Sequence, residues 1–472
     1  MISRSYAIKQ FVHALSRCSV FTAALIGLCS SALADPRFPG GETTTSVQGA
    51  NAFSQPAANL SFEDRLNFSV GNSFFRNPWV SAPATTEARD GLGPIFNTNS
   101  CQGCHIKDGR GHPPNDDQPL SVSTLIRISI PETTEKTAKP HQGVINEPTY
   151  GDQIQGFAVP SVPAEMRTHW EWEPHILEGS NGKTYELRKP KISFDQFGYG
   201  ELHPETRFSP RVAPAMIGLG LLEAIPESDI RAQADPDDRD NNGISGRANE
   251  VWDARQKKLT LGRYGWKAGK PNVEQQSAAA FFGDMGLSSS IHPGSPCQPA
   301  QTQCRNAPNG GAPEVSDEIL SVVTFYSKHL APPSRPNALQ PEIVDGESLF
   351  HQVGCAECHT PSWKTGEIAN PSLANQAIYP YTDLLLHDMG EGLADHRQEF
   401  SATGTEWRTA PLWGLGDYID VNGHTELLHD GRARDAFEAI LWHGGEATNS
   451  RDKVLALSDS EQTLLVQFLN SL

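Results

Sequence analysis

The sequence contains no apolar run of the ~20 residues that a membrane-spanning helix requires. Positive charge is also in short supply, because 38 Lys and Arg stand against 56 Asp and Glu and the formal net charge is −18. These two absences argue against membrane insertion and against nucleic acid or anionic lipid as partners. Gly and Pro are abundant, at 41 and 35 residues, beside a hydrophobic content of 37%. The 472 residues therefore predict a globular, loop-rich protein of two or three domains.

The first 34 residues have the pattern of a cleaved export signal. Three basic residues precede a short apolar run over Val20–Leu28, and Ala32-Leu33-Ala34 fits a signal-peptidase site before Asp35. We therefore predict a signal peptide over residues 1–34 and a periplasmic location for the remaining chain. Removal of this segment takes away three positive charges, so the net charge changes from −18 to −21.

Cysteine is scarce, at eight residues. Two cysteines lie in the predicted signal peptide, and four lie in two Cys-x-x-Cys-His motifs, Cys101–His105 and Cys355–His359. The remaining two, Cys297 and Cys304, are even in number, close in sequence and exported. They are predicted to form a disulfide that clamps a loop.

Each Cys-x-x-Cys-His motif has the pattern of a covalent haem site. The two cysteines of a motif can form thioethers to the vinyl groups of one haem, and the following histidine is then held beneath the iron as an axial ligand. A zinc or redox Cys-x-x-Cys is the alternative interpretation. The predicted binding residues of two covalently bound haem c groups are Cys101, Cys104, His105, Cys355, Cys358 and His359.

The two motifs lie in two similar halves of the chain. Each half continues with a related Arg-x-Ala-Pro string, over Arg211–Gly220 and Arg408–Gly416. Each half ends in an apolar helix that opens with Ser-Asp, near Ser316 and at Ser458, where Glu461 completes a capping box. The apolar positions at helical spacing are Ile319, Val322, Val323 and Tyr326 in the first helix and Leu464, Leu465, Phe468 and Leu469 in the second.

These features predict a mainly α fold with two tandem cytochrome-c-like haem domains. The domains are expected over residues 35–335 and 336–472, with Pro332–Pro336 as the linker. The first domain carries two insertions. One, at about 110–205, contains alternating runs typical of β-strands, such as Leu125–Ile130 and Lys183–Leu187. The other, at about 228–262, is acidic and polar.

The acidic insertion contains the first half of a calcium loop. Asp238, Asp240 and Asn242 place oxygen ligands at alternate positions, and Gly243 suits the turn that follows. The twelfth position of the loop is Asn249 and not Glu, so a closing ligand has to come from elsewhere. A solvated turn is the alternative to a calcium site.

Three further strings are long and specific: Trp407–Gly414, Leu428–Arg432 and Trp442–Glu446. Through them, the chain from about residue 74 to residue 472 resembles the di-haem oxidoreductase family often labelled a predicted thiol oxidoreductase. A more remote resemblance links it to the bacterial di-haem cytochrome c peroxidase superfamily, which includes the enzyme that matures methylamine dehydrogenase. That superfamily also implies a calcium ion between the haem domains.

The peroxidase resemblance implies roles for three residues near the first haem. Trp266 would lie between the two haems, and Gln276 and Asp284 would belong to the catalytic site, with Asp284 in place of the Glu of the peroxidases. A buried carboxylate can carry a proton from the near to the far oxygen of peroxide as the O–O bond breaks. The alternatives are core packing for Trp266 and a helix-end carboxylate without a catalytic task for Asp284.

The same resemblance implies that His443 is the distal ligand of the second haem, opposite His359. The local pattern agrees, since His443 lies one turn beyond Ile440 on an apolar helix face. A helix C-terminal imidazolium is the alternative role of His443, and Met389 is the rival ligand. His387 is interpreted as a propionate or structural contact. His112 could cap the first haem, although a loop role is the more common one.

The resulting prediction is a periplasmic di-haem oxidoreductase of the peroxidase type. Electrons from a small redox protein, a cytochrome c or a cupredoxin, would enter at the second haem, pass Trp266 and reduce hydrogen peroxide at the first. A non-catalytic electron-transfer cytochrome is the alternative. Thiol oxidation has little support, because the only mature cysteines outside the haem motifs, Cys297 and Cys304, lack a Cys-x-x-Cys arrangement.

Overall fold

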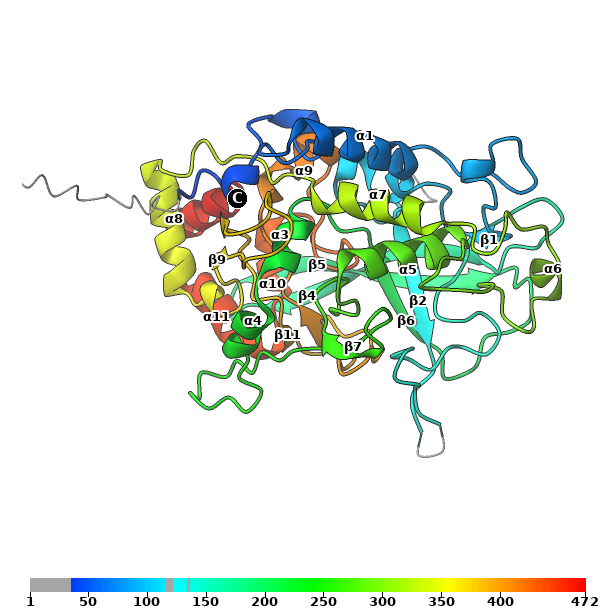
Figure 1. Cartoon of the computed structure of the whole chain (residues 1–472). Helices are drawn as coiled ribbons and strands as arrows, with labels where there is room; N and C mark the ends of the chain where they lie inside the picture. Colours follow the sequence, from blue (N-terminus) through cyan, green and yellow to red (C-terminus); the bar gives the residue numbers. More distant parts are fainter. Residues whose placement is uncertain (1–34, 116–121, 134–135) are drawn as a thin grey trace, which may run out of the picture. The chain divides into compact units, whose positions relative to one another are not determined.

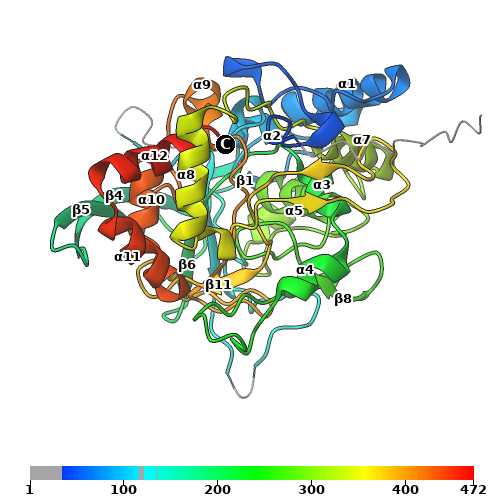
Figure 2. The ribbon, with the colours of Figure 1, turned by 90° about the vertical axis from the view of Figure 1, so that its left-hand side faces the viewer.

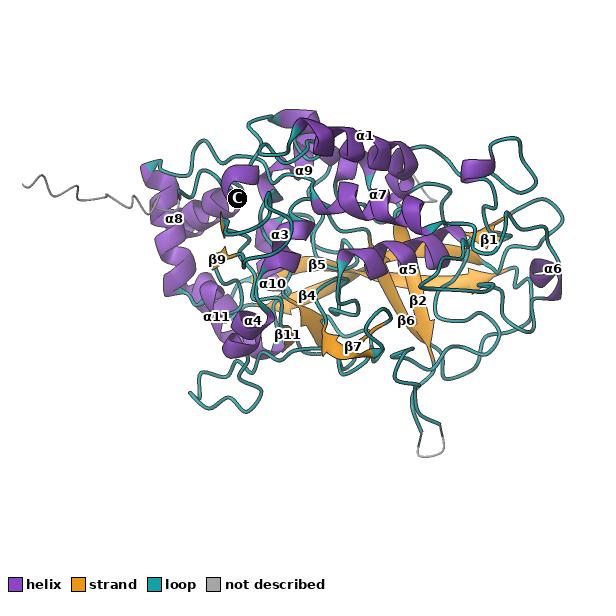
Figure 3. Ribbon diagram, viewed as in Figure 1, coloured by secondary structure: helices purple, strands orange, loops and turns teal. Residues whose placement is uncertain are grey.

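Helices and strands are interleaved along the chain in the computed structural model, which describes residues 35–115, 122–133 and 136–472 (Figures 1 and 3). The helices are α1 Phe62–Arg76, α2 Cys101–Cys104, α3 Leu219–Ala224, α4 Glu227–Gln233, α5 Val273–Met285, α6 Thr302–Arg305, α7 Asp317–Lys328, α8 Pro341–Gln352, α9 Tyr418–Asn422, α10 Ala436–Leu441, α11 Thr448–Ala456 and α12 Asp459–Leu469. The predicted signal peptide lies outside the described residues.

The strands are β1 Ile95–Phe96, β2 Thr124–Ser129, β3 Phe157–Ala158, β4 Arg167–Glu178, β5 Thr184–Asp195, β6 Arg207–Val212, β7 Glu250–Asp253, β8 Lys258–Leu261, β9 Trp363–Lys364, β10 Ala377–Ile378, β11 Leu386–Asp388 and β12 Glu406–Arg408. They form antiparallel pairs: β1 with β3, β2 with β6, β4 with β5, β7 with β8, β9 with β10 and β11 with β12. The strands predicted at Leu125–Ile130 and Lys183–Leu187 are confirmed as parts of β2 and β5.

The prediction of a mainly α fold is wrong. Helices hold 29% of the chain and strands 18%, which makes the fold a mixed one. Much of the strand content comes from the first insertion, where β4 and β5 pair over twelve positions each. The period-2 alternation of this segment predicts strands within an insertion, and these strands supply a large share of the regular structure.

The two closing helices begin where their sequences predict. The Ser316 side chain accepts a hydrogen bond from the Ile319 backbone at the start of α7, and Ser458 and Glu461 form the capping box of α12. Each helix packs closely on an earlier one. A Cβ at Gly71 of α1 would lie 2.1 Å from the Val322 carbonyl oxygen of α7, so only glycine permits this approach.

The second half repeats this arrangement. A Cβ at Gly346 of α8 would lie 2.3 Å from the Leu464 carbonyl oxygen of α12. Phe350 of α8 and Phe468 of α12 pack with ring centroids 5.3 Å apart. The internal repeat seen in the sequence is therefore also visible as a glycine-mediated helix pair in each half.

The largest apolar core joins both halves. Phe53, Ile217 and Trp266 belong to the same buried cluster as Phe350 and Trp413. Residues 35–472 form one compact unit, so the boundary predicted at 335/336 stays a prediction.

The predicted linker packs inside this unit. The Ser334 backbone donates to the Thr45 carbonyl at 2.8 Å, and Arg335 Nε donates to the Ser471 carbonyl at 2.9 Å.

The β4–β5 hairpin of the first insertion lies beside α10 and α11 (Figures 1 and 2). His175 stacks on Trp442 with ring centroids 4.8 Å apart, and Arg188 forms an ion pair with Glu426 at 3.3 Å. An insertion in the first half thereby packs on the C-terminal part of the second half, around Glu426 and Trp442.

Two other expectations concern the disulfide and membrane-spanning helices. Cys297 and Cys304 are joined by a disulfide, and both residues are buried. Within the described residues, no helix combines the length and the apolar character needed to cross a membrane.

Candidate functional site

The first Cys-x-x-Cys-His motif lines a cavity. Ser100 caps α2 by accepting a hydrogen bond from the Gly103 backbone at 3.2 Å, so that Cys101 begins the helix. His105 follows the helix, and its Nδ1 lies 2.8 Å from the Pro214 carbonyl oxygen. Because a carbonyl can only accept, Nδ1 carries the proton and Nε2 keeps a lone pair for a metal. Burial lowers the pKa of His105 to about 4, which favours the neutral form that ligates iron.

The cysteines of this motif do not suit a thiolate site. Cys101 and Cys104 are not bonded to each other, and burial raises the pKa of Cys101 to about 12. Burial therefore disfavours the thiolate that a redox Cys-x-x-Cys uses as its nucleophile. Within the described residues, no group of three or more His, Cys, Asp and Glu is arranged to hold a metal ion. A pair of thiols beside a free imidazole nitrogen in a cavity is instead the donor set of a haem.

All three predicted catalytic residues line this same cavity. Gln276 and Asp284 come from opposite ends of α5, and Trp266 precedes that helix. Asp284 Oδ1 accepts a hydrogen bond from Gln153 Nε2 at 2.8 Å. Burial raises the pKa of Asp284, while the charge of Arg127 opposes that rise. The structure thus brings these residues together at the first motif, and their roles stay predictions.

The cavity also has a charged wall that the sequence interpretation missed. Arg127 forms an ion pair with Asp152 at 3.0 Å, and Arg397 forms one with Glu399 at 2.8 Å. Lys270 lines the same cavity. One signal was available, because Arg127 interrupts an apolar strand between Ile126 and Ile128. The other charged residues of this wall come from distant segments, and no local sequence pattern marks them as neighbours of the cavity.

The second motif lines a second cavity. His359 Nδ1 lies 3.0 Å from the Tyr381 carbonyl oxygen, so its Nε2 is also left with a lone pair. His443 lines the same cavity, and its Nδ1 lies 2.6 Å from the Ala439 carbonyl oxygen of α10. Two histidines with free Nε2 atoms in one cavity fit a haem with two imidazole ligands. Met389 lines this cavity as well, so the choice between it and His443 stays open.

His387 and His112 take other positions. The Nε2 of His387 lies 2.8 Å from Asp383 and its Nδ1 2.8 Å from Glu446, so no ring nitrogen is left for iron. Burial alone would lower the pKa of His387, but these carboxylates raise it well above its ordinary value. His112 packs against His424 with ring centroids 5.6 Å apart and is not among the residues that line the first cavity.

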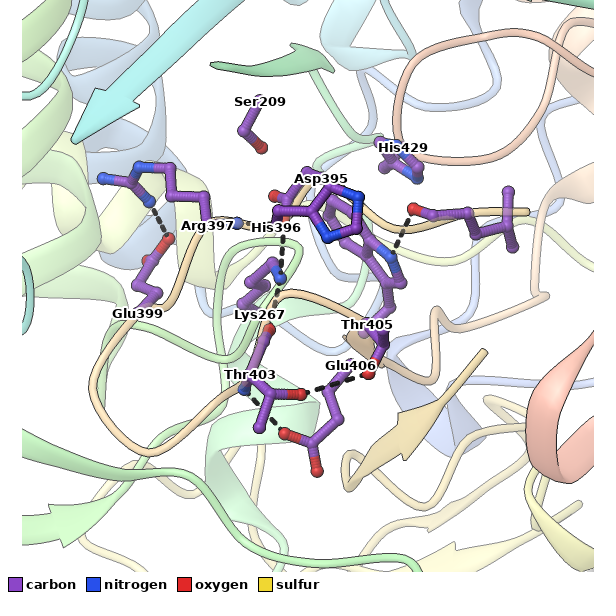
Figure 4. Close-up of polar contacts among 12 residues, drawn as sticks. Ser209, Lys267, Asp395, His396, Arg397, Glu399, Thr403, Thr405, Glu406 and His429 are labelled. Carbon is purple, nitrogen blue, oxygen red and sulfur yellow. Dashed lines mark hydrogen bonds and ion pairs between the residues drawn. The ribbon is translucent and has the colours of Figure 1, made fainter. Parts of the chain in front are cut away.

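Trp266 forms part of a wall between the two cavities, since it lines both. Its Nε1 donates to the Val212 carbonyl oxygen at 2.9 Å. The next residue, Lys267, is buried and lies 2.9 Å from Asp395 (Figure 4). Lys267 also donates to the Thr403 carbonyl at 2.6 Å. The indole is therefore held directly by its bond to Val212, and the next residue is anchored by the bonds of the Lys267 side chain.

The predicted calcium ligands lie in an exposed loop. Their oxygens accept hydrogen bonds from the backbone of the same turn: Asp238 from Gly243 at 3.1 Å, Asp240 from Asn242 at 3.2 Å and Asn242 from Ile244 at 2.8 Å. This is the pattern of a self-contained polar turn. Calcium binding stays a prediction.

Comparison with known proteins adds one finding. A family model described as "Di-haem oxidoreductase, putative peroxidase" matches residues 34–173 and 184–472. The resemblance stated from the sequence strings is therefore confirmed. Neither the curated proteins nor the solved structures give a significant match.

Proposed function

Because the chain belongs to the di-haem oxidoreductase family, we propose that it is a periplasmic enzyme of the peroxidase type. It takes electrons from a small redox protein, a cytochrome c or a cupredoxin, and transfers them to an oxidant. Hydrogen peroxide is the first candidate for that oxidant. The observation that carries the proposal is the shared cavity of Asp284, Gln276 and the first motif, which Trp266 separates from the cavity of the second motif.

The haems are proposed to be covalently attached. The cysteine pairs Cys101/Cys104 and Cys355/Cys358 provide four thiols that are free to form thioethers. His105 and His359 each present an unprotonated Nε2, because a backbone carbonyl holds the proton on Nδ1. Bound haem supplies an iron that accepts electrons and, where a coordination position is open, binds an oxidant.

Asp284 is proposed to move a proton between the two oxygens of the oxidant. Gln153 bonds Oδ1, so Oδ2 is the oxygen that can take a proton from the substrate and return it. The raised pKa of Asp284 brings its carboxyl closer to the working pH, which favours proton exchange in both directions. Gln276, in the first turn of the same helix, offers an amide that can orient the oxidant.

The second cavity is proposed to receive the electrons. His443 and His359 suit a closed, low-spin site there, which favours electron transfer over substrate binding. Trp266 is a single side chain in the wall of both cavities and is therefore the proposed link between them.

A spectroscopic experiment tests the proposal. Protein purified from a host that matures c-type cytochromes should show the mass of two haems, a sharp reduced α-band, and one high-spin and one low-spin ferric signal. The half-reduced protein should react with peroxide within a stopped-flow measurement. Two low-spin signals without peroxide reaction would instead establish an electron carrier.

The disulfide loop gives no support to thiol oxidation. Neither Cys297 nor Cys304 is among the residues that line the two cavities. Mass spectrometry that shows the bond intact through turnover would dispose of this alternative.

A further inference from the structure

Two arginines form part of the wall between the cavities. Arg110 and Arg408 each line both of them, as Trp266 does. Arg110 is only 5% exposed, and its guanidinium lies 5.3 Å from the Trp266 ring centroid. Positive charge is therefore concentrated at the one place where the two sites adjoin.

Among the described residues, backbone carbonyls and not carboxylates bind both arginines. Arg110 donates from Nε to the Glu426 carbonyl at 2.8 Å and from Nη2 to the Leu428 carbonyl. Arg408 donates from Nε to the Gly265 carbonyl at 2.9 Å and from Nη1 to the Thr409 carbonyl at 3.1 Å. In the described part of the chain, no carboxylate forms an ion pair with either one, and one Nη of each has no hydrogen-bond acceptor.

Several other buried cations near these cavities are paired with carboxylates, whereas Arg263, which lines the first cavity only, forms no ion pair with a described residue. Lys267 is paired with Asp395 at 2.9 Å, and Arg397 with Glu399 at 2.8 Å. In the lining of the second cavity, Arg451 is the other cation, and it is paired with Asp452 at 3.1 Å. A buried charge without a partner is strongly unfavourable, so the missing ion pairs of Arg110 and Arg408, which line both cavities, point to an anion that binds there.

We propose that Arg110 and Arg408 bind haem propionate carboxylates from both cavities. Each haem carries two carboxylates, and the planar arginine fork matches a carboxylate in geometry and charge. This inference rests on the two-haem part of the proposed function and not on the peroxide chemistry. It makes the two arginines positioning residues that couple the haem sites electrostatically.

The coupling has a measurable consequence. A fixed positive charge near an iron favours its reduced state, and an arginine in the common wall acts on both irons. Loss of one such charge should therefore lower both reduction potentials. A residue that lines one cavity only should act mainly on the iron of that cavity.

Redox titration of the purified full-length holoprotein, followed optically, tests the proposal. The titration should show one wave for each haem. Arg408→Gln should lower the equilibrium constant for reduction of each haem by at least tenfold, which lowers each reduction potential by about 59 mV for a one-electron couple. Arg408→Lys keeps the charge and should restore most of the loss. Arg263→Gln is the matched control, because Arg263 is also buried without an acidic partner but lines the first cavity only, so one wave should move.

Arg110→Gln provides a second variant with the same expected result, should Arg408→Gln fail to assemble. The proposal would be overturned if both glutamine variants bind two haems but neither variant changes the reduction potentials of both haems. Wild-type potentials that change with added phosphate or chloride would also overturn it, since the arginines would then hold a free anion. Protein without haem would refute the proposed function itself, whereas normal shifts without peroxide turnover would leave this inference intact.

Discussion

Asp284 experiences opposing influences on its charge. It lies in the last turn of α5, where burial raises its pKa. Arg127 and the hydrogen bond from Gln153 stabilise the ionised form. A carboxyl group held between its two forms in a cavity is typical of acid–base catalysis.

Asp284→Asn should lower the peroxide turnover by about 100-fold or more, because the amide cannot carry a proton. Steady-state turnover at equal haem content measures this. Wild-type activity should also fall as the pH drops through the raised pKa of Asp284, since the protonated carboxyl can no longer accept a proton. That acid limb should be absent in the variant.

Glu274→Gln is the matched control for this change. Glu274 lies on the same helix but pairs with Arg255 outside the cavity lining, so turnover should stay unchanged. An Asp284→Asn enzyme as active as Glu274→Gln would show that Asp284 has no proton to move.

Substitutions can also show whether His443 or Met389 is the second ligand of the haem in the second cavity. His443→Ala should convert the low-spin signal of the second haem to a high-spin one, because the Nε2 that faces the cavity is lost. Met389→Leu should leave that signal unchanged. Electron paramagnetic resonance of the ferric protein measures both, and the opposite pattern would assign the ligand to Met389.

At the scale of elements, the β4–β5 hairpin ties the first half of the chain to the second. Arg188 of β5 packs over the Trp172 ring at 4.1 Å and reaches Glu426 at 3.3 Å. Its Nε also donates to the Arg432 carbonyl at 3.2 Å. Both charged partners are mostly buried, so solvent screens this ion pair less than a surface pair.

Arg188→Ala should therefore lower the free energy of unfolding by about 1–2 kcal/mol, from the lost cation–π contact and the lost charged hydrogen bonds. Urea unfolding of the holoprotein measures the change. Lys183→Ala, at the exposed tip of the hairpin, removes only a solvated pair with Asp459 and should have no measurable effect. If the two substitutions change the free energy of unfolding equally, the contacts of Arg188 do not stabilise the packing of the hairpin on the second half.

At the scale of the whole molecule, the net charge of −18 favours a basic electron donor. The rate of reduction by a basic cytochrome c should fall as ionic strength rises, because the Debye length shrinks from ~30 Å at 0.01 M to ~8 Å at 0.15 M. Stopped-flow mixing measures this rate. An acidic donor should show the reverse dependence, and a salt-independent rate with the basic donor would argue against electrostatic recognition.

The error in fold class arose at this larger scale. The sequence predicts the helix starts at Ser316 and Ser458 and the strands within β2 and β5. It underestimates the share of strand in the whole fold. Two haem motifs suggested two helical domains, whereas the first insertion supplies a long hairpin that packs on α10 and α11. Local patterns identify an element, but they do not tell how much of the fold it will make up.

By itself, the sequence determined what depends on chain neighbours: the spacing of each Cys-x-x-Cys-His motif, the serine caps of α7 and α12, and the alternation of β2 and β5. Covalent spacing and hydrogen bonds within a few residues set these features. Only the tertiary structure decided that Trp266, Arg110 and Arg408 share one wall, and that Arg127 faces the same cavity as Asp284. Such contacts depend on the packing of segments far apart in the chain, which no local period encodes.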